Sequence, residues 1–159
     1  MISEKAVGTL LTGIPKGWVT WDYELREQRS LVATLYLDWM TERARCTISG
    51  RSWELARESW LGGAFQMKQS GKVFASAEKP NVLFRSFVVK FDSKTYRWEA
   101  ESAFVRTFQL FEGDQVIGTM RPENMFTRRA TIELPAEFSL ERKAFLVWLA
   151  LLIWRRQPE

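Results

Sequence analysis

The chain has 159 residues, of which 46% are apolar and 26% are charged, and its net charge at pH 7 is +4. This composition is typical of a single globular domain and excludes a disordered chain. The chain has one cysteine, Cys46, and no histidine. These two facts exclude an intramolecular disulfide, a structural zinc site and any catalytic or metal-binding histidine. We expect neither a metal nor another cofactor.

Basic residues are spread evenly along the chain. Residues 1–80 contain 11 Lys and Arg against 9 Asp and Glu, and residues 81–159 contain 12 against 10. The linear sequence therefore lacks the basic stripe or arm that nucleic-acid-binding proteins use, and we expect no nucleic-acid partner. The N-terminal sequence Met-Ile-Ser-Glu-Lys lacks the layout of a signal peptide, so we expect a cytoplasmic location.

The first third of the chain is interpreted mainly as strands. Residues 1–13 are expected to form one further edge strand or to be loose. Residues 23–45 are ambiguous, because Leu31 and Leu35 fit helical spacing whereas the start of the stretch alternates. We interpret residues 23–45 as strands.

Four hairpins are predicted where short turn sequences separate alternating apolar residues. The predicted turns are Ser49-Gly50, Ser70-Gly71, Asp92-Ser93-Lys94 and Glu112-Gly113-Asp114. The clearest hairpin spans residues 82–101, and another joins residues 104–111 to 115–121. Residues 130–134 form the last predicted strand, which ends at Pro135.

The C-terminal segment predicts a helix over about residues 140–156. Ser139 suits the N-cap, and Arg155 and Arg156 suit the negative end of the helix dipole. Residues 144–154 are apolar on every face, so the helix must be surrounded by protein or by lipid. Eleven residues span only about 16 Å, whereas a bilayer core is about 30 Å thick. Burial inside the protein is therefore favoured over a short tail anchor.

These segments add up to about twelve strands before one helix. A barrel of eight strands has room only for side chains, whereas a helix with its side chains is about 10–12 Å across. Enclosing a helix therefore takes a wider barrel. We predict a mainly β fold, in which a closed antiparallel barrel of about twelve strands surrounds a hydrophobic C-terminal helix. Residues 1–159 are expected to form this single domain.

The end of the chain carries a recognisable pattern. A strand is followed by Leu134-Pro135, Ser139-Leu140, a charged stretch and an apolar helix, and upstream lies Phe108-x-Leu110-x-x-Gly113-x-x-Val116-Ile117-Gly118-x-Met120. This pattern resembles the tubby C-terminal-like superfamily, which includes tubby proteins, phospholipid scramblases and plant LURP-one-related proteins. The resemblance covers residues 104–156, and the strand rhythm extends it back to about residue 45. It implies a twelve-stranded barrel around a hydrophobic C-terminal helix.

The functional sites of that superfamily transfer poorly to this chain. Scramblases carry an acidic, calcium-binding segment just before the final strand, whereas residues 126–130 here read Phe-Thr-Arg-Arg-Ala. Tubby domains bind phosphoinositides through surface Lys and Arg residues whose positions cannot be matched in this sequence. The resemblance therefore implies a fold more than a function.

Three other features have catalytic and structural interpretations. Ser70-Gly71-Lys72 lacks the upstream Gly and the following Ser or Thr of a phosphate loop, so it is interpreted as a turn. The pairs Glu99/Glu101 and Asp22/Glu24 have the spacing of one strand face and suit acid–base work or a hard cation. We interpret them as solvated strand faces, and Cys46 as a buried structural thiol.

Basic residues near the end of the chain are the candidate binding residues. Arg121, Arg128 and Arg129 precede the last strand, while Arg142 and Lys143 lie at the start of the helix. Guanidinium groups suit phosphate, and basic clusters suit anionic lipid. We therefore name these five residues as candidate ligands of an anion or lipid headgroup. The structural alternative is that they solvate the barrel ends or cap helix carbonyls.

The leading functional hypothesis is a non-enzymatic binding or adaptor module for anionic lipid headgroups, located peripherally at a membrane surface. The alternative is a structural or protein-interaction domain, whose exposed aromatic residues form a homo-oligomer interface. A hydrolase that uses carboxylates alone is the least favoured hypothesis, because only generic Asp and Glu residues are available to it.

Overall fold

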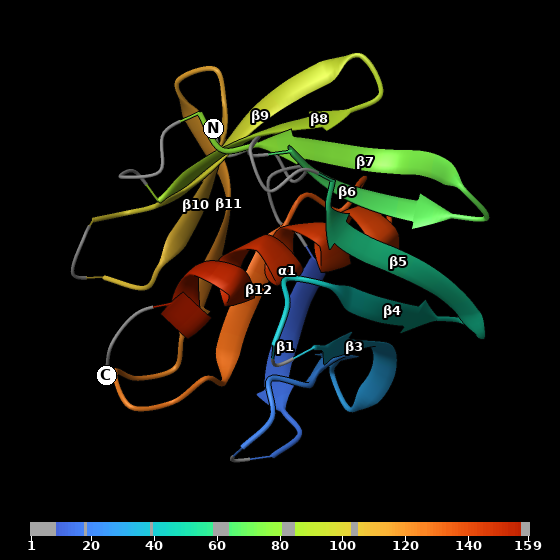
Figure 1. Ribbon diagram of the computed structural model, residues 1–159. Helices are drawn as coiled ribbons and strands as arrows, with labels where there is room; N and C mark the ends of the chain where they lie inside the picture. Colours follow the sequence, from blue (N-terminus) through green and yellow to red (C-terminus); the bar gives the residue numbers. More distant parts are fainter. Residues whose placement is uncertain are drawn as a thin grey trace.

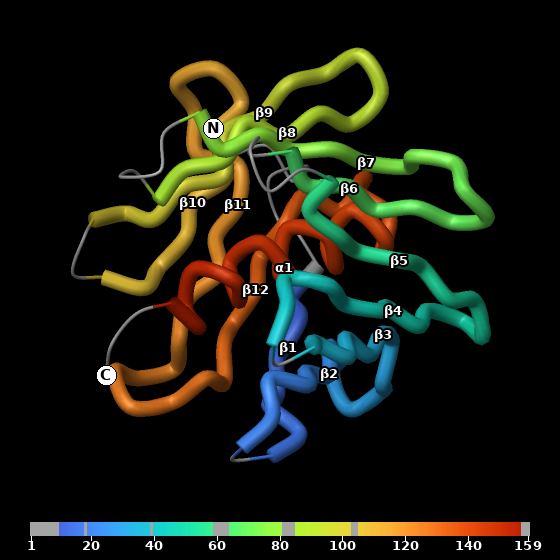
Figure 2. The backbone as a smooth tube through the Cα atoms, in the orientation of Figure 1, coloured from blue at the N-terminus to red at the C-terminus, as the bar shows by residue number. Residues whose placement is uncertain are grey.

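The computed structural model describes residues 9–17, 19–38, 40–58, 64–80, 85–102 and 105–156. Within these residues twelve antiparallel strands form one closed barrel, with each strand paired to its neighbours in the chain (Figures 1 and 2). The strands are β1 (Thr9–Pro15), β2 (Tyr23–Glu27), β3 (Ser30–Leu37), β4 (Ala44–Ile48), β5 (Arg51–Arg57), β6 (Ala64–Gln69), β7 (Lys72–Glu78), β8 (Ser86–Phe91), β9 (Lys94–Ala100), β10 (Phe108–Glu112), β11 (Gln115–Pro122) and β12 (Ala130–Leu134).

The predicted fold class, a mainly β closed barrel of about twelve strands with a C-terminal helix, is confirmed. The ambiguous stretch 23–45 forms β2, β3 and the start of β4, as interpreted. One strand boundary differs from the prediction. Strand β10 begins at Phe108 rather than at residue 104, and Val105 to Thr107 belong to the preceding loop. Residue 104 lies outside the described residues.

Strand β1 corrects the expectation for the N-terminal residues. It pairs on one side with β12, where Leu11 faces Ile132, and on the other side with β2, where Leu11 faces Glu27. It is therefore the strand that closes the barrel and is not an edge strand. Gly13 permits this closure, because a Cβ atom there would lie 2.4 Å from the Tyr23 ring. Residues 1–8 lie outside the described residues.

Helix α1 (Leu140–Arg156) runs through the barrel (Figure 1). Its bounds agree with the prediction, and the Ser139 hydroxyl caps it by accepting a hydrogen bond from the Arg142 N–H at 3.3 Å. Every residue from Lys143 to Trp154 is buried. The Trp148 ring packs edge-on against Phe65 of β6, with 5.9 Å between the ring centroids. The apolar helix is thus surrounded by barrel side chains, as its sequence requires.

The antiparallel order gives the barrel two different ends. At the hairpin end, two-residue turns join β2–β3, β4–β5, β6–β7, β8–β9 and β10–β11, and residues 135–139 lead into the helix. At the loop end, the connections are residues 16–22, 38–43, 58–63, 79–85, 101–107 and 123–129, and the helix ends there. Ser49-Gly50 and Ser70-Gly71 have positive φ at both residues, which is the geometry of the tightest hairpin turn.

Candidate functional site

The five predicted binding residues fall at opposite ends of the barrel. Arg121, Arg128 and Arg129 lie at the loop end, at or near the β11–β12 connection, whereas Arg142 and Lys143 lie in the first turn of α1 at the hairpin end. The 17 residues of the helix separate the two groups, a length of about 25 Å at 1.5 Å per residue. The structure therefore does not bring all five residues into one site.

The two hairpin-end residues have partners within the fold or are enclosed by it. Arg142 forms an ion pair with Asp92 of the β8–β9 turn, and its guanidinium lies 5.2 Å from the centre of the Phe91 ring. Lys143 is only 4% exposed. Burial lowers the pKa of its amine, and the carboxylates of Glu27 and Glu137 partly oppose this effect. Neither side chain is presented to a ligand at the loop end.

Arg128 clamps two loops together. Its guanidinium donates to the carbonyl of Thr20 at 2.6 Å and to the carbonyl of Gly17, and it lies 4.8 Å from the centre of the Trp21 ring. The Arg128 carbonyl in turn accepts a hydrogen bond from the Tyr23 hydroxyl at 2.6 Å. The β11–β12 loop is thereby tied to the β1–β2 loop, and both terminal nitrogens of the Arg128 guanidinium donate inside the protein.

Arg106 and Arg155 act in the same way on neighbouring loops. Arg106 donates to three carbonyls of the β11–β12 loop, those of Asn124 at 3.2 Å, Met125 at 3.2 Å and Thr127 at 2.7 Å. Arg155, in the last turn of α1, donates to two carbonyls in the β3–β4 loop, at 2.6 and 2.7 Å. We call Arg106, Arg128 and Arg155 the arginine clamps. Sequence reasoning missed Arg106, because a lone arginine that bonds carbonyls leaves no pattern.

Other cations at the loop end remain available to a ligand. Lys16, Arg43 and Arg121 are exposed, and among the described residues their side chains form no ion pair. Arg129 is also exposed and pairs with Glu123 at 3.3 Å, an interaction that solvent weakens. The predicted candidates Arg121 and Arg129 therefore differ from Arg128, whose guanidinium is engaged.

The two ends differ in charge. The loop-end connections, with Arg155 and Arg156, contain nine basic and six acidic residues. The hairpin turns, residues 135–139 and the first helical turn at 140–143 contain three basic and four acidic residues. The counted loop-end segments therefore carry a net charge of +3, and the counted hairpin-end segments carry a net charge of −1. Basic and acidic residues are evenly spread along the sequence. The fold nevertheless brings six connections to each end of the barrel, and those at the loop end contain more basic residues than those at the hairpin end.

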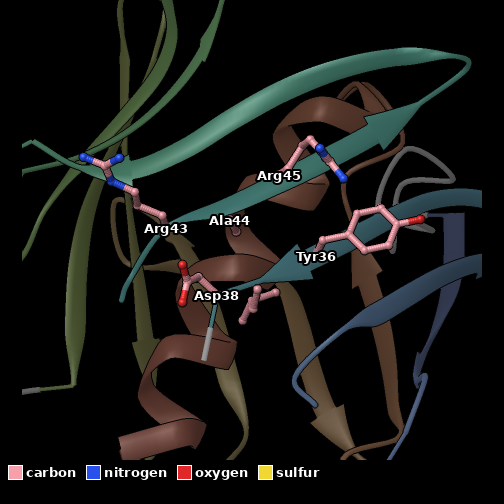
Figure 3. Close-up of a pocket in the computed structure, with 6 residues that line it drawn as sticks. Tyr36, Asp38, Arg43, Ala44 and Arg45 are labelled. Carbon is pink, nitrogen blue, oxygen red and sulfur yellow. The ribbon is translucent and has the colours of Figure 1, made fainter. Parts of the chain in front are cut away.

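An open groove of about 450 Å³ lies on strands β3 and β4 near the loop end (Figure 3). Arg43 and Asp38 lie on one side of it, and Arg45 reaches toward Tyr36 on the other. The cationic groups of Lys16 and Arg45 lie 5.1 and 5.3 Å from the centre of the Tyr36 ring. Two cations thus lie against the Tyr36 ring, and a third, Arg43, lies on the other side of the groove.

Within the described part of the chain, the groove is lined by one carboxylate, that of Asp38, and this carboxylate bonds the backbone of its own loop. Hydrogen bonds from the backbone N–H groups of Met40, at 2.8 Å, and Thr41, at 3.3 Å, hold the pKa of Asp38 below its usual range. Asp38 therefore fixes the start of the β3–β4 loop. The three nearby cations outnumber this single negative charge, so the groove suits an anionic group.

One carboxylate of each sequence pair is engaged in the barrel wall, whereas Asp22 and Glu101 lie in the adjoining loops. Glu24 pairs with Arg26 at 2.6 Å, and Glu99 accepts a hydrogen bond from the Ser86 hydroxyl at 3.1 Å. Within the described ranges, no three His, Cys, Asp or Glu side chains are placed to hold a metal ion. Cys46 is fully buried, as interpreted, and burial raises the pKa of its thiol to about 12.

The part of the chain that the structure describes contains no helix of the length and apolarity needed to cross a bilayer. The superfamily resemblance of residues 104–156 stays a prediction. Comparisons with protein-family models, with curated proteins and with solved structures found no match to this chain.

Proposed function

We propose that the protein is a non-enzymatic module that binds anionic membrane surfaces peripherally through the loop end of the barrel. The observation that carries this proposal is the charge difference between the ends, +3 over the counted loop-end segments against −1 over the counted hairpin-end segments. A Lys or Arg near an anionic bilayer contributes about 1 kcal/mol of attraction. A few available cations on one face are therefore enough for reversible attachment.

The side chains assigned to direct contact are the available cations. Arg121 and Arg129 lie beside the β11–β12 loop, and Lys16 and Arg43 lie beside the groove of Figure 3. Guanidinium groups match phosphate oxygens with paired donors. Arg128 is a positioning residue in this proposal, because its contacts hold the loop that presents its neighbours.

The test compares charge reversal at the two ends. The loop-end variant combines Arg43→Glu with Arg121→Glu, and the matched hairpin-end variant combines Arg29→Glu with Lys94→Glu. All four side chains are exposed, so both variants should fold like the wild type. Co-sedimentation is measured with phosphatidylcholine vesicles, with and without phosphatidylserine, at low and high salt.

We expect the wild type to bind the anionic vesicles, more weakly at high salt. The loop-end variant should lose at least about tenfold in affinity, while the hairpin-end variant binds like the wild type. Equal binding by the two variants would contradict the assignment to the loop end. Absence of wild-type binding to anionic vesicles would contradict the function itself.

The alternative is a homo-oligomerising domain, and it is favoured by large apolar side chains exposed at the loop end, among them Met125 and Phe126. Sedimentation velocity over a range of protein concentrations separates the two functions. A mass that rises with concentration, in protein that ignores every vesicle, would support the oligomer. A monomer that binds anionic vesicles would support the membrane-binding module.

A further inference from the structure

Large apolar side chains stand exposed at the tips of three loop-end connections. Val19 in the β1–β2 loop is 91% exposed, and Phe126 in the β11–β12 loop is 92% exposed. Met125 beside Phe126, and Met40 in the β3–β4 loop, are each about three-quarters exposed. We call these four residues the apolar tips. Single exposed apolar side chains are normal on a protein surface, whereas several gathered at one end mark an interaction site, so their common position is informative.

The three loops that carry the apolar tips are neighbours around the barrel rim. The strand order β11-β12-β1-β2-β3-β4 places the β11–β12, β1–β2 and β3–β4 loops side by side. The arginine clamps Arg106 and Arg128 bond the backbone of the β11–β12 and β1–β2 loops. The Asn124 side chain accepts the Phe126 N–H at 2.9 Å. A preordered frame of this kind lowers the entropy cost of binding.

The surroundings of the apolar tips identify their partner by its chemistry. The exposed cations Lys16, Arg43, Arg121 and Arg129 lie at the same end of the barrel. An anionic bilayer accepts apolar side chains among its acyl chains and cations at its headgroups, so it complements both features at once.

The sequence of these connections agrees with an interfacial partner. The β1–β2 and β3–β4 connections also contain Trp18 and Trp39, which lie outside the described residues. Tryptophan is enriched where proteins meet the membrane–water interface. In the turns and linker of the hairpin end, by contrast, Phe138 is the one aromatic residue, and it is buried in the core.

We infer that the apolar tips insert into the interfacial layer of an anionic bilayer. The barrel then stands with its loop end and the C-terminal end of α1 toward the lipid, and with its hairpin turns in water (Figure 1). This inference rests on the proposed function and adds two properties to it. The first is a fixed orientation, and the second is a component of binding that salt does not screen.

Labelled cysteines test insertion and orientation together. Cys46 is fully buried and its pKa is raised to about 12, so it stays unreactive in the folded protein and needs no replacement. An environment-sensitive fluorophore is attached to Met125→Cys in one variant. The matched control carries it on Ser93→Cys, in the β8–β9 turn of the hairpin end. Both are mixed with phosphatidylcholine–phosphatidylserine vesicles, and co-sedimentation is measured on the same samples.

We expect the probe at residue 125 to shift to shorter wavelength and to be quenched by lipids that carry a quencher in the upper acyl chain. The probe at residue 93 should not change. Co-sedimentation without a shift at residue 125 would overturn insertion and leave the proposed function standing. An equal shift at residue 93 would overturn the orientation. Absence of co-sedimentation would overturn the proposed function and the inference together.

A second pair of variants measures what one apolar tip contributes. Phe126→Ser removes a ring that is 92% exposed, and Val73→Ser is the control on β7 near the hairpin end, where Val73 is half-exposed. Both variants should keep the wild-type thermal midpoint. Phe126→Ser should weaken binding to anionic vesicles roughly tenfold and make the remainder more sensitive to salt. Wild-type affinity of Phe126→Ser at high salt would overturn the inference.

Discussion

The two ends of this barrel are built from the same antiparallel strands but differ in chain length, charge and chemistry. At the hairpin end, two residues suffice to reverse the chain, and the backbone groups of the paired strands satisfy each other. At the loop end, each connection is at least six residues long. Its backbone carbonyls need donors from elsewhere, because buried or half-buried polar groups left unpaired are costly.

This difference explains where the arginines are used. Arg106, Arg128 and Arg155 each donate to at least two carbonyls of loop-end connections. A rigid barrel with fixed loops at one end is a common way to present binding residues. The hairpin end is constrained by its turns, whereas the loop end has room for apolar tips and available cations.

The largest effect on stability is expected from a substitution in the middle of helix α1, between the two ends of the barrel. Trp148 is fully buried in α1 and contacts Phe65 and Phe145. Trp148→Ala should lower the free energy of unfolding by about 3–5 kcal/mol, because it leaves a large cavity. Hydrogen exchange should then accelerate at both ends together, and urea unfolding gives the magnitude. Faster exchange at one end alone would show that the helix does not couple the stability of the two ends.

Trp148→Phe is the control for this prediction. Among the described residues, the Trp148 indole N–H has no hydrogen-bond acceptor. Replacing the indole by a phenyl ring therefore removes volume without removing a hydrogen bond, and the loss should be clearly smaller than for Trp148→Ala. An equal loss in the two variants would contradict the cavity explanation.

The next largest effect on stability should distinguish the adjacent residues Arg128 and Arg129. Arg128→Ala removes the clamp on the β1–β2 loop and should cost about 1–3 kcal/mol, because charged donors to two carbonyls are lost. Arg129→Ala removes an exposed ion pair and should cost less than about 0.5 kcal/mol. Hydrogen exchange should accelerate in residues 16–22 and 123–129 of the Arg128 variant, with the hairpin turns unchanged. Similar behaviour of the two variants would refute the clamp.

The barrel wall and its helix were accessible from the sequence because each has a periodic signal. Ser49-Gly50 and Ser70-Gly71 identify tight turns, and the apolar run of residues 144–154 identifies an enclosed helix. The role of β1 was not accessible, since its partner β12 lies more than one hundred residues away. Gly13 is meaningful only beside the Tyr23 ring, which lies against it from the adjacent strand β2.

The candidate site was predictable only as a collection of charges. Arg128 and Arg129 look equivalent in the sequence, yet one bonds carbonyls of another loop and the other is exposed. The separation of Lys143 from these residues follows from the direction of α1 through the barrel. Such contacts depend on how loops meet in space, and no local pattern encodes them.

An effect smaller than that of Trp148→Ala is expected from alkaline pH, which acts on Cys46 in the barrel wall. Burial raises the pKa of Cys46 from 9.0 to about 12, so above pH 9 the unfolded chain loses this proton before the folded one does. The contribution of Cys46 to the free energy of unfolding is therefore fully present below about pH 9 and is lost as the pH rises toward 12. The loss should be on the order of 1–2 kcal/mol near pH 10.5. Urea unfolding of wild type and Cys46→Ala measures it, and identical pH slopes would contradict the assignment.

The most direct test of a membrane-facing loop end is hydrogen exchange of the wild-type protein with and without anionic vesicles. Protection should increase in residues 16–22, 38–43 and 123–129, while the turns at residues 28–29, 49–50 and 92–93 exchange as they do in solution. Protection at those turns, or equal protection at the two ends, would contradict the division of the barrel into a lipid-facing end and a water-facing end.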